Sequence, residues 1–308
     1  MSQAVRIVEV SPRDGLQTEP GRLDTATKIL LVERLIAAGL KEIEVAGFVR
    51  ADRVPQLADA EAVCRGLLPR AGARLSALVP NVRGLERARL AGIDAIAFLT
   101  AASETFCRRN TGCSICESLD RFRELMVRAR TDGILWVRAY VSCAFGCPYE
   151  GRVGPQVIAD LSGRLAALGC DEIALADTIG VATPAQVREV LQAVSREMPA
   201  DRLALHLHDT RGQALASVYA CLELGIGAVD SSVAGLGGCP FAPGAAGNLA
   251  TEDLVYMLEG CGIQTGVNLD WLVAVGRFIS CALRRQNCSR VGSMTGDPGR
   301  EHSHSQLA

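Results

Sequence analysis

The sequence contains no long apolar run and no cluster of basic residues. The chain has 308 residues and a formal net charge of −2. A basic nucleic-acid-binding surface is therefore not supported. No apolar stretch reaches the roughly 18 residues that a membrane-spanning helix needs. We expect neither a nucleic acid nor a membrane as a partner.

The amino terminus lacks an apolar signal core and a presequence rich in arginine and serine. Its first residues, MSQAVRIVEV, lead directly into a stretch that is typical of a β-strand. Secretory and organellar targeting segments have a different composition. We expect a bacterial cytoplasmic protein, or a mitochondrial matrix protein whose presequence has been removed.

Cysteine, in contrast, is abundant, with 12 residues. In a long chain without a signal peptide, most of these cysteines are expected to be buried, reduced thiols. The segment CRRNTGCSIC brings Cys107, Cys113 and Cys116 close together in sequence, as in some zinc sites. A fourth ligand at a matching spacing is missing and no histidine is near, which disfavours structural zinc here.

Short β-branched segments alternate with longer amphipathic segments along most of the chain. Hydrophobic residues make up 49% of it, enough for a large core. Four times, a helical pattern ends on glycine just before the next strand, at Gly39, Gly92, Gly169 and Gly225. Eight strand–helix units in series favour a closed parallel barrel over an open sheet. The predicted strands are residues 5–11, 42–48, 74–80, 94–100, 135–143, 172–178, 202–209 and 228–235.

The predicted fold class is α/β, a (β/α)8 TIM barrel with extra C-terminal helices over residues 249–262 and 268–286. Residues 1–290 are expected to form one catalytic domain, and residues 291–308 a disordered tail. Residues 101–118 exceed a plain connection and are predicted to be an active-site loop. In such barrels the chemistry lies at the C-terminal ends of the strands.

Two histidines occur at the end of the predicted seventh strand, in the segment HLHD. Side chains alternate along a strand, so His206 and His208 point the same way, roughly 7 Å apart at the backbone. They could be hydrogen-bonded core residues, or they could bind one divalent cation. The chain has only two other histidines, and both lie near its end.

Charged residues at other strand ends favour the cation. Arg13 and Asp14 follow the first strand. Asp14 offers a hard oxygen ligand, and Arg13 can hold an oxyanion. Glu44 lies in the second strand, and Asp177 follows a run in the sixth that is too apolar for an idle charge.

Asn248 adds a neutral oxygen at the end of a glycine-rich segment. Asp14, His206, His208 and Asn248 together supply two nitrogens and two oxygens. They leave two positions of an octahedral ion for a chelating substrate. This donor set suits Mg²⁺ or Mn²⁺, with Zn²⁺ as an alternative.

The glycine-rich segment GLGGCPFAPGAAGN, residues 235–248, carries one thiol, Cys239. With VEVSPRDGLQTE, YVSCAFGCPYEG, ADTIG, HLHDT and NLATEDL, it resembles the 3-hydroxy-3-methylglutaryl-CoA lyases from about residue 5 to residue 286. The RDG and HxHD segments alone would indicate only the wider family of metal-dependent barrel lyases and Claisen-type synthases. The block GLGGCP…GNLATEDL is more specific to the lyases.

The resemblance implies a metal-dependent retro-Claisen cleavage of 3-hydroxy-3-methylglutaryl-CoA to acetyl-CoA and acetoacetate, as in leucine degradation and ketone-body formation. It implies an acyl-CoA substrate, and we expect a homo-oligomer, a dimer. In that family the glycine-rich segment closes over the substrate, and its cysteine takes part in proton transfer. The residues it implies as catalytic are Arg13, Asp14, Glu44, Asp177 and Cys239, and those in contact with substrate are Arg13, Asn110 and Tyr140.

Some positions depart from the family pattern. Ala46 and Gly47 replace a hydroxyl-bearing pair, and Arg211 stands where a tyrosine is expected. These departures leave open the same chemistry on another 3-hydroxyacyl-CoA. A Claisen-type synthase would be expected to carry a further C-terminal region. A non-catalytic metal-binding barrel is disfavoured because it would bury charges without a role.

Overall fold

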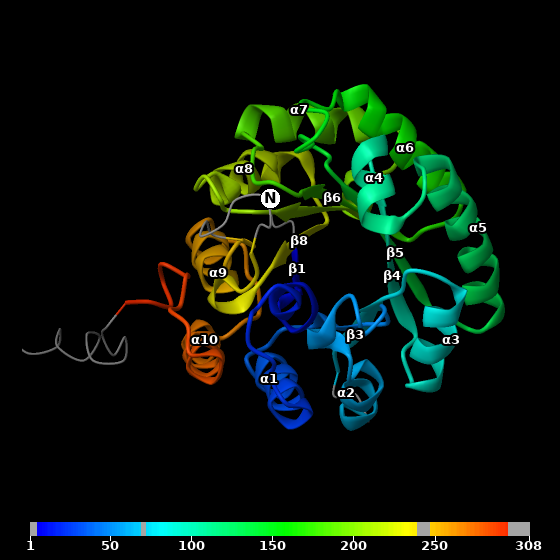
Figure 1. Cartoon of the computed structure of the whole chain (residues 1–308). Helices are drawn as coiled ribbons and strands as arrows, with labels where there is room; N and C mark the ends of the chain where they lie inside the picture. Colours follow the sequence, from blue (N-terminus) through cyan, green and yellow to red (C-terminus); the bar gives the residue numbers. More distant parts are fainter. Residues whose placement is uncertain (1–4, 69–71, 239–246, 295–308) are drawn as a thin grey trace, which may run out of the picture.

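Eight parallel strands close into a barrel in this computed structural model, which describes residues 5–68, 72–238 and 247–294. The strands pair in chain order, and β8 pairs with β1. Figure 1 shows the helices as a ring around the strands. The predicted (β/α)8 barrel and its eight strands are confirmed. They are β1 (Arg6–Glu9), β2 (Glu42–Gly47), β3 (Arg74–Leu78), β4 (Ala95–Ala101), β5 (Trp136–Ser142), β6 (Glu172–Asp177), β7 (Leu203–Leu207) and β8 (Ala228–Ser231).

At least one helix follows each strand, with both α4 and α5 after β4, and the last described helix, α10, packs beside α1 and α9. The four glycines predicted to end helices have φ values of 106°, 83°, 89° and 81°, which disfavour residues with a side chain. The helices are α1 (Thr25–Ala37), α2 (Ala60–Gly66), α3 (Val82–Leu90), α4 (Glu104–Thr111), α5 (Ile115–Thr131), α6 (Pro155–Ala167), α7 (Pro184–Val194), α8 (Ala214–Cys221), α9 (Thr251–Gly260) and α10 (Leu269–Leu283).

The predicted loop over residues 101–118 was wrong for its middle part, because α4 occupies it. Ser103 caps this helix by accepting a hydrogen bond from the Phe106 amide, and Gly112 ends it with φ of 70°. Ser114 and Glu117 then form a capping box that starts α5. The first of these helices, α4, has only about two turns and no complete apolar stripe. Its capping residues, rather than a hydrophobic periodicity, therefore mark it in the sequence.

The barrel has one apolar layer outside its strands and another inside. On β7, Leu203, Leu205 and Leu207 face the helices, as the alternation predicted. The inner layer is unusual because half of its buried members are alanine, where bulky branched residues usually fill such barrels. Its buried members are Val8, Val10, Leu78, Ala97, Tyr140, Ala174, Ala204 and Ala228. Small side chains leave room for charged ones inside the barrel.

The described part of the chain after α10 remains attached to the barrel. The Asp253 carboxylate accepts hydrogen bonds from Ser289 Oγ and from the amides of Arg290 and Val291. The predicted domain boundary at residue 290 therefore falls within a bonded segment. The rest of the predicted tail, residues 295–308, lies outside the described residues.

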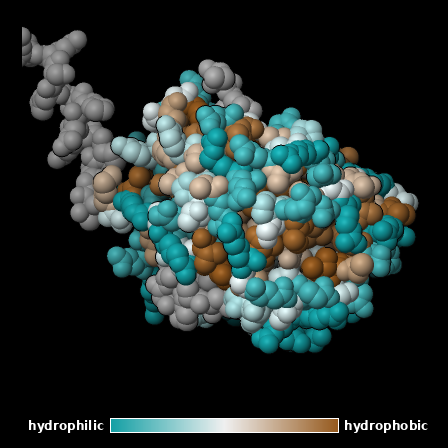
Figure 2. All heavy atoms as spheres, turned by 90° about the horizontal axis from the view of Figure 1, so that it is seen from above, coloured by the Kyte–Doolittle hydropathy of each residue, from teal (hydrophilic) through white to brown (hydrophobic). Residues whose placement is uncertain are grey.

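Exposed apolar residues are distributed among polar ones. Figure 2 shows hydrophobic patches interspersed with hydrophilic residues over the face that it draws. The most exposed large apolar side chains include Leu135, Leu90 and Val127. Within the described ranges, none of the helices has the length and apolar character needed to cross a bilayer.

Candidate active site

Arg13 and Asp14 lie on a five-residue π-helical turn, Ser11–Gly15, just after β1. Pro12 lies near its start, where the fixed φ angle of proline suits the first turn of a helix. Gly15 is required by a close approach, because a Cβ there would lie 2.8 Å from Ser232 Oγ. The turn therefore packs tightly on the loop after β8. It holds the two neighbouring charged residues at the C-terminal mouth of the barrel.

The end of β7 places His206, His208 and Asn248 together. His206 lies within β7, and His208 follows it in an isolated bridge with Asn248. Hydrogen bonds from the Asp209 amide to Gly247 O, 2.7 Å, and from the Leu249 amide to Leu207 O, 3.1 Å, fix this bridge. Asn248 is far from β7 in sequence, but its backbone extends the sheet at this point.

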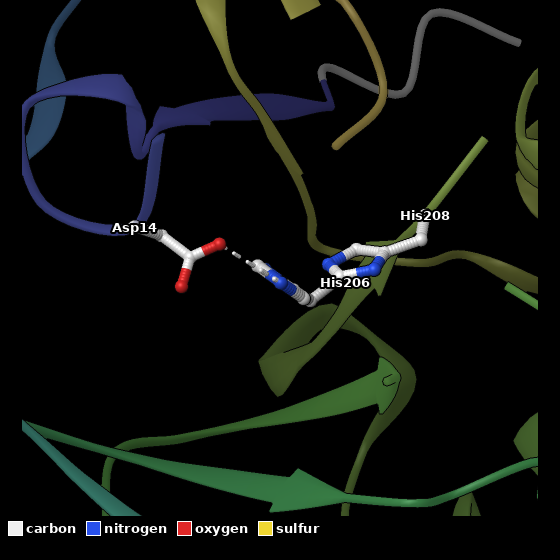
Figure 3. A group of neighbouring side chains, drawn as sticks. All are labelled: Asp14, His206 and His208. Atoms are coloured by element: carbon white, nitrogen blue, oxygen red, sulfur yellow. Dashed lines mark ion pairs between the residues drawn. The ribbon is translucent and has the colours of Figure 1, made fainter. Parts of the chain in front are cut away.

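Asp14, His206 and His208 form a possible metal-binding group. One ligand atom from each residue lies within 4.8 Å of the others. In Figure 3, the Asp14 carboxylate from the β1 turn points toward the ring of His206, and His208 lies beside that ring. Asp14 Oδ2 lies 3.7 Å from His206 Nε2 and accepts a hydrogen bond of 2.8 Å from Asn248 Nδ2. The predicted ligand set is thus brought together.

The charges of these groups fit a bound cation. Burial and the neighbouring His206 lower the pKa of His208 to about 4, which leaves its ring neutral at pH 7. Its buried Nδ1 has no hydrogen-bond partner among the described residues. Burial opposes ionisation of Asp14, but Arg13 and the two histidines hold the pKa of Asp14 below its usual value. An ionised carboxylate and a neutral imidazole are the forms that bind metals.

Arg13 is held beside this group by Glu44. The guanidinium donates to Glu44 Oε2 from Nε at 2.9 Å and from Nη2 at 2.7 Å, and to Asp14 Oδ1 from Nη1 at 2.6 Å. Tyr140 also donates to Glu44 Oε2, at 3.1 Å. Glu44 and Arg13 are 1% and 6% exposed, so each charge depends on the other for compensation.

A cavity of about 380 Å³ opens over these residues. Asn110, on α4, and Tyr140, on β5, both line it, as the resemblance implied. Asp14 is the only carboxylate along its described walls. The cavity is lined by Arg13, Asp14, Gln17, Thr18, Leu78, Leu99, Phe106, Arg109, Asn110, Tyr140, Ser142, Tyr149, Ala176, Thr178, His206, His208 and Gly238. Cys239 lies outside the described residues, directly after Gly238.

The structure does not bring the Asp177 carboxylate into this cavity. Its strand neighbours Ala176 and Thr178 line the cavity, whereas Asp177 accepts hydrogen bonds from the amides of Val181, 3.0 Å, and Ala182, 2.9 Å. Burial raises the pKa of Asp177. The carboxylate shapes the loop after β6, and its catalytic role stays a prediction.

Arg211, one of the departures from the family pattern, also does not line the cavity. Its guanidinium donates to the carbonyls of Ile179, 3.0 Å, and Gly180, 2.7 Å. It therefore joins the loops after β6 and β7. Gly47 is closer to the chemistry, because a Cβ there would lie 3.7 Å from Arg13 Cγ.

Two buried residues behind the site were missed by the sequence analysis. Asp230 on β8 lies 3.0 Å from His206 Nδ1, and Arg138 on β5 donates to Asp230 at 2.5 Å. The signal that could have found them is the one applied to Asp177, a charge within an apolar strand. Asp230 is 2% exposed and Arg138 is 4% exposed.

Comparison with known proteins identifies the family of the chain. The model of the family described as HMGL-like matches residues 4–279. The chain belongs to the HMGL-like family. Among curated HMGL-like relatives, the mitochondrial hydroxymethylglutaryl-CoA lyase of Bos taurus is 50% identical over 291 residues, covering 94% of this chain and 89% of the relative.

Solved HMGL-like structures agree over the same length. Hydroxymethylglutaryl-CoA lyase from Pseudomonas aeruginosa superposes with a TM-score of 0.92 at 48% identity, covering 95% of this chain and 97% of that one. An HMG-CoA lyase from Acinetobacter baumannii, solved with coenzyme A and 3-methylmalate, gives a TM-score of 0.91 at 35% identity, covering 100% and 99%.

Proposed function

We propose that this HMGL-like protein cleaves 3-hydroxy-3-methylglutaryl-CoA to acetyl-CoA and acetoacetate. The observation that carries the proposal is identity of about half the residues, over nearly the full length, with proteins named for that lyase. The mouth of the barrel offers the groups that this chemistry needs, because Asp14, His206 and Arg13 meet in one cavity.

The proposed metal is Mg²⁺ or Mn²⁺, held by Asp14, His206, His208 and Asn248. The donors are a carboxylate, two imidazoles and an amide, a set without thiolate, which favours these ions over zinc. When bound, the cation would lower the pKa of the substrate's tertiary hydroxyl.

The residues of this chain then move protons and hold charge. Asp14, the only carboxylate on the described cavity walls, accepts the hydroxyl proton. The hydroxyl carbon becomes the ketone of acetoacetate as its bond to the neighbouring carbon breaks. The electron pair passes into the thioester as an enolate, whose oxygen Arg13 holds. The thiol of Cys239 gives the enolate carbon its proton and completes acetyl-CoA.

Glu44 and Tyr140 act through Arg13. Glu44 accepts two hydrogen bonds from the guanidinium, and Tyr140 donates to the same Glu44 oxygen, so the two residues fix the direction in which the guanidinium points. A preorganised cation stabilises developing charge without moving during the reaction. Asn110 and Tyr140 bind the acyl portion from the cavity wall. The dimer expected from the resemblance stays a prediction.

A second candidate is the same reaction on another 3-hydroxyacyl-CoA. Gly47 favours it, because it departs from the hydroxyl-bearing residue of the family pattern beside Arg13, whose Cγ lies 3.7 Å from the point that a Cβ at residue 47 would occupy. Turnover of 3-hydroxyacyl-CoA thioesters with shorter and longer acyl chains separates the two candidates.

The test of the proposed function is a coupled assay for acetoacetate released from 3-hydroxy-3-methylglutaryl-CoA. The protein is first stripped with EDTA and then assayed with and without added Mg²⁺. Acetoacetate release that depends on Mg²⁺ is the expected result. No release under any metal, with cleavage of a different 3-hydroxyacyl-CoA, would favour the second candidate.

A further inference from the structure

A buried carboxylate lies behind His206, on the side away from Asp14. Asp230 of β8 pairs in register with His206 of β7, and its Oδ2 lies 3.0 Å from His206 Nδ1. The other ring nitrogen, Nε2, lies 3.7 Å from Asp14 Oδ2. The imidazole of His206 is thus placed between two carboxylates, one on each nitrogen.

This contact determines where the ring proton lies. An ionised carboxylate only accepts hydrogen bonds, so Nδ1 must carry the hydrogen that bridges to Asp230. In a neutral ring, Nε2 then keeps its lone pair and directs it toward Asp14. The ring of Tyr140 meets that of His206 edge-on, with centroids 5.6 Å apart and planes at 81°. The orientation of His206 is therefore fixed by a hydrogen bond and by packing.

Arg138 keeps Asp230 charged inside the barrel. Its Nη2 donates to Asp230 Oδ1 at 2.5 Å, its Nε lies 2.9 Å from Glu172 Oε1, and its Nη1 donates to the hydroxyl of Tyr140 at 3.1 Å. Asp230 and Glu172 are 2% and 1% exposed. A buried charge needs a paired and hydrogen-bonded partner, and the alanine-lined interior gives this guanidinium the room to serve both carboxylates.

The two histidines of the site differ in this respect. His208 Nδ1 has no hydrogen-bond partner among the described residues, whereas His206 Nδ1 has Asp230. A carboxylate that accepts the second N–H of a ligating histidine fixes its tautomer and raises its basicity as a ligand. Only one of the two rings is built for that purpose here.

We infer that Asp230 is a positioning residue, which holds His206 in the Nδ1–H tautomer so that Nε2 faces the cation. The inference rests on the proposed metal site. Asp230 does not line the described cavity, and its direct contact with the metal-binding group is the one with His206. Loss of such a partner typically weakens metal binding by about 10–100-fold.

The test measures Mn²⁺ binding to the full chain by electron paramagnetic resonance, without substrate. Asp230→Asn keeps the shape of the side chain but offers an amide that can donate to Nδ1 and support the other tautomer. Its Mn²⁺ dissociation constant is expected to rise by about 10–100-fold. The matched control is Glu172→Gln, which removes a carboxylate from the same Arg138 without touching His206, and should bind Mn²⁺ like the wild type.

Wild-type Mn²⁺ affinity in Asp230→Asn would overturn the inference. Equal weakening of Mn²⁺ binding in Glu172→Gln would also overturn it, because it would indicate a general disturbance of the buried charges. His206→Ala separates the inference from the metal site: unchanged affinity in that variant would mean that the metal assignment itself fails. If Asp230→Asn does not fold, nitrogen NMR of the Mg²⁺-loaded wild type decides. The His206 signals must show hydrogen on Nδ1, and hydrogen on Nε2 would overturn the inference.

Discussion

Arg13 donates two hydrogen bonds to a single oxygen of Glu44, from Nε at 2.9 Å and from Nη2 at 2.7 Å. A third, from Nη1, reaches Asp14. Lysine has one nitrogen and cannot reproduce this planar set of donors. The direction of the Arg13 charge therefore depends on guanidinium geometry as well as on charge.

Arg13→Lys is expected to lower kcat by about 10²–10³, the typical loss for one oxyanion donor. Steady-state kinetics with saturating Mg²⁺ measures it. Arg123→Lys is a suitable control, because Arg123 forms an exposed pair with Asp120 on α5 and does not line the described cavity. A lysine variant with wild-type kcat would mean that Arg13 serves only to neutralise its neighbours.

Removal of the metal should abolish cleavage. Treatment with EDTA is expected to stop acetoacetate release, and Mg²⁺ or Mn²⁺ should restore it. His206→Ala and His208→Ala should weaken Mn²⁺ binding as well as turnover, because each removes one of few ligands. His302→Ala changes a histidine of the C-terminal segment and should leave both unchanged. Full activity in the stripped protein contradicts the metal assignment.

Cys239→Ser should fold and bind Mn²⁺ but lose turnover by roughly 10²–10⁴, because serine is a much weaker acid than a thiol. Thiol labelling of the wild type, with peptide mapping, should find Cys239 modified and protected by a bound substrate analogue. Burial raises the pKa values of Cys170 and Cys221 to about 12, and also raises that of Cys143, so these thiols should react slowly.

Exposed thiols complicate the labelling, and protection by the analogue is what separates them from Cys239. The exposed cysteines of the described chain are Cys116, Cys261, Cys281 and Cys288. They should be labelled equally with and without the analogue. Inactivation that maps to one of them, or unchanged turnover in Cys239→Ser, would remove Cys239 from the proposed mechanism.

Glu252 should make stability fall as the pH rises. Burial, together with the charges of Glu9 and Asp253, raises the pKa of Glu252 to about 8 from 4.5. The folded state therefore binds a proton that the unfolded state has lost between these two values. Each unit by which the pH rises within that window therefore lowers the free energy of unfolding by up to about 1.4 kcal/mol. The stabilisation is complete below 4.5 and is lost as the pH reaches 8.

Glu252→Gln isolates this contribution, because its amide oxygen can still accept from the Ala234 amide that Glu252 binds. Urea unfolding at several pH values should show a smaller decline for the variant than for the wild type. Parallel declines in the two proteins would show that Glu252 is ionised in the folded state.

Gly227→Ala should destabilise the fold. A Cβ at this position, just before β8, would lie 1.9 Å from the backbone oxygen of Asp201. Such overpacking typically costs about 1–3 kcal/mol, and here backbone must move. The control is Gly260→Ala at the end of α9, where a Cβ meets nothing within 4 Å. Thermal unfolding of both variants measures the difference, and equal melting temperatures would contradict the expected clash.

The barrel and most of the candidate metal-binding group could be predicted because both depend on local patterns. Strand alternation paired His206 with His208, and parallel closure brings all strand ends to one mouth. Asp177 shows the limit of that reasoning. Side chains alternate along a strand, and its neighbours Ala176 and Thr178 line the cavity, so the Asp177 side chain points away from it. The alternation was applied to the seventh strand but not to the sixth.

The contact of Asp230 with His206 could not be predicted from strand alternation. Its partners, His206 and Arg138, come from other strands, and the Arg138 contact spans 92 positions in sequence. Whether two inward-facing residues meet depends on the register between strands and on the size of the side chains between them. The small alanines of the inner layer leave room for Asp230 and Arg138 to meet. Alanine occurs in helices, strands and loops alike, so its presence in the sequence does not predict that room.

The turn after β1 has a consequence for how this site can change over evolutionary time. Arg13 and Asp14 are consecutive residues on a turn of five residues, and Gly15 locks that turn against the loop after β8. A residue inserted or deleted there would displace the proposed cation ligand and the proposed enolate-binding residue together. Single substitutions that accumulate one at a time would not exchange the roles of the two residues. The two proposed roles are therefore tied to one turn, and we expect divergence toward new substrates to begin at other walls of the barrel mouth.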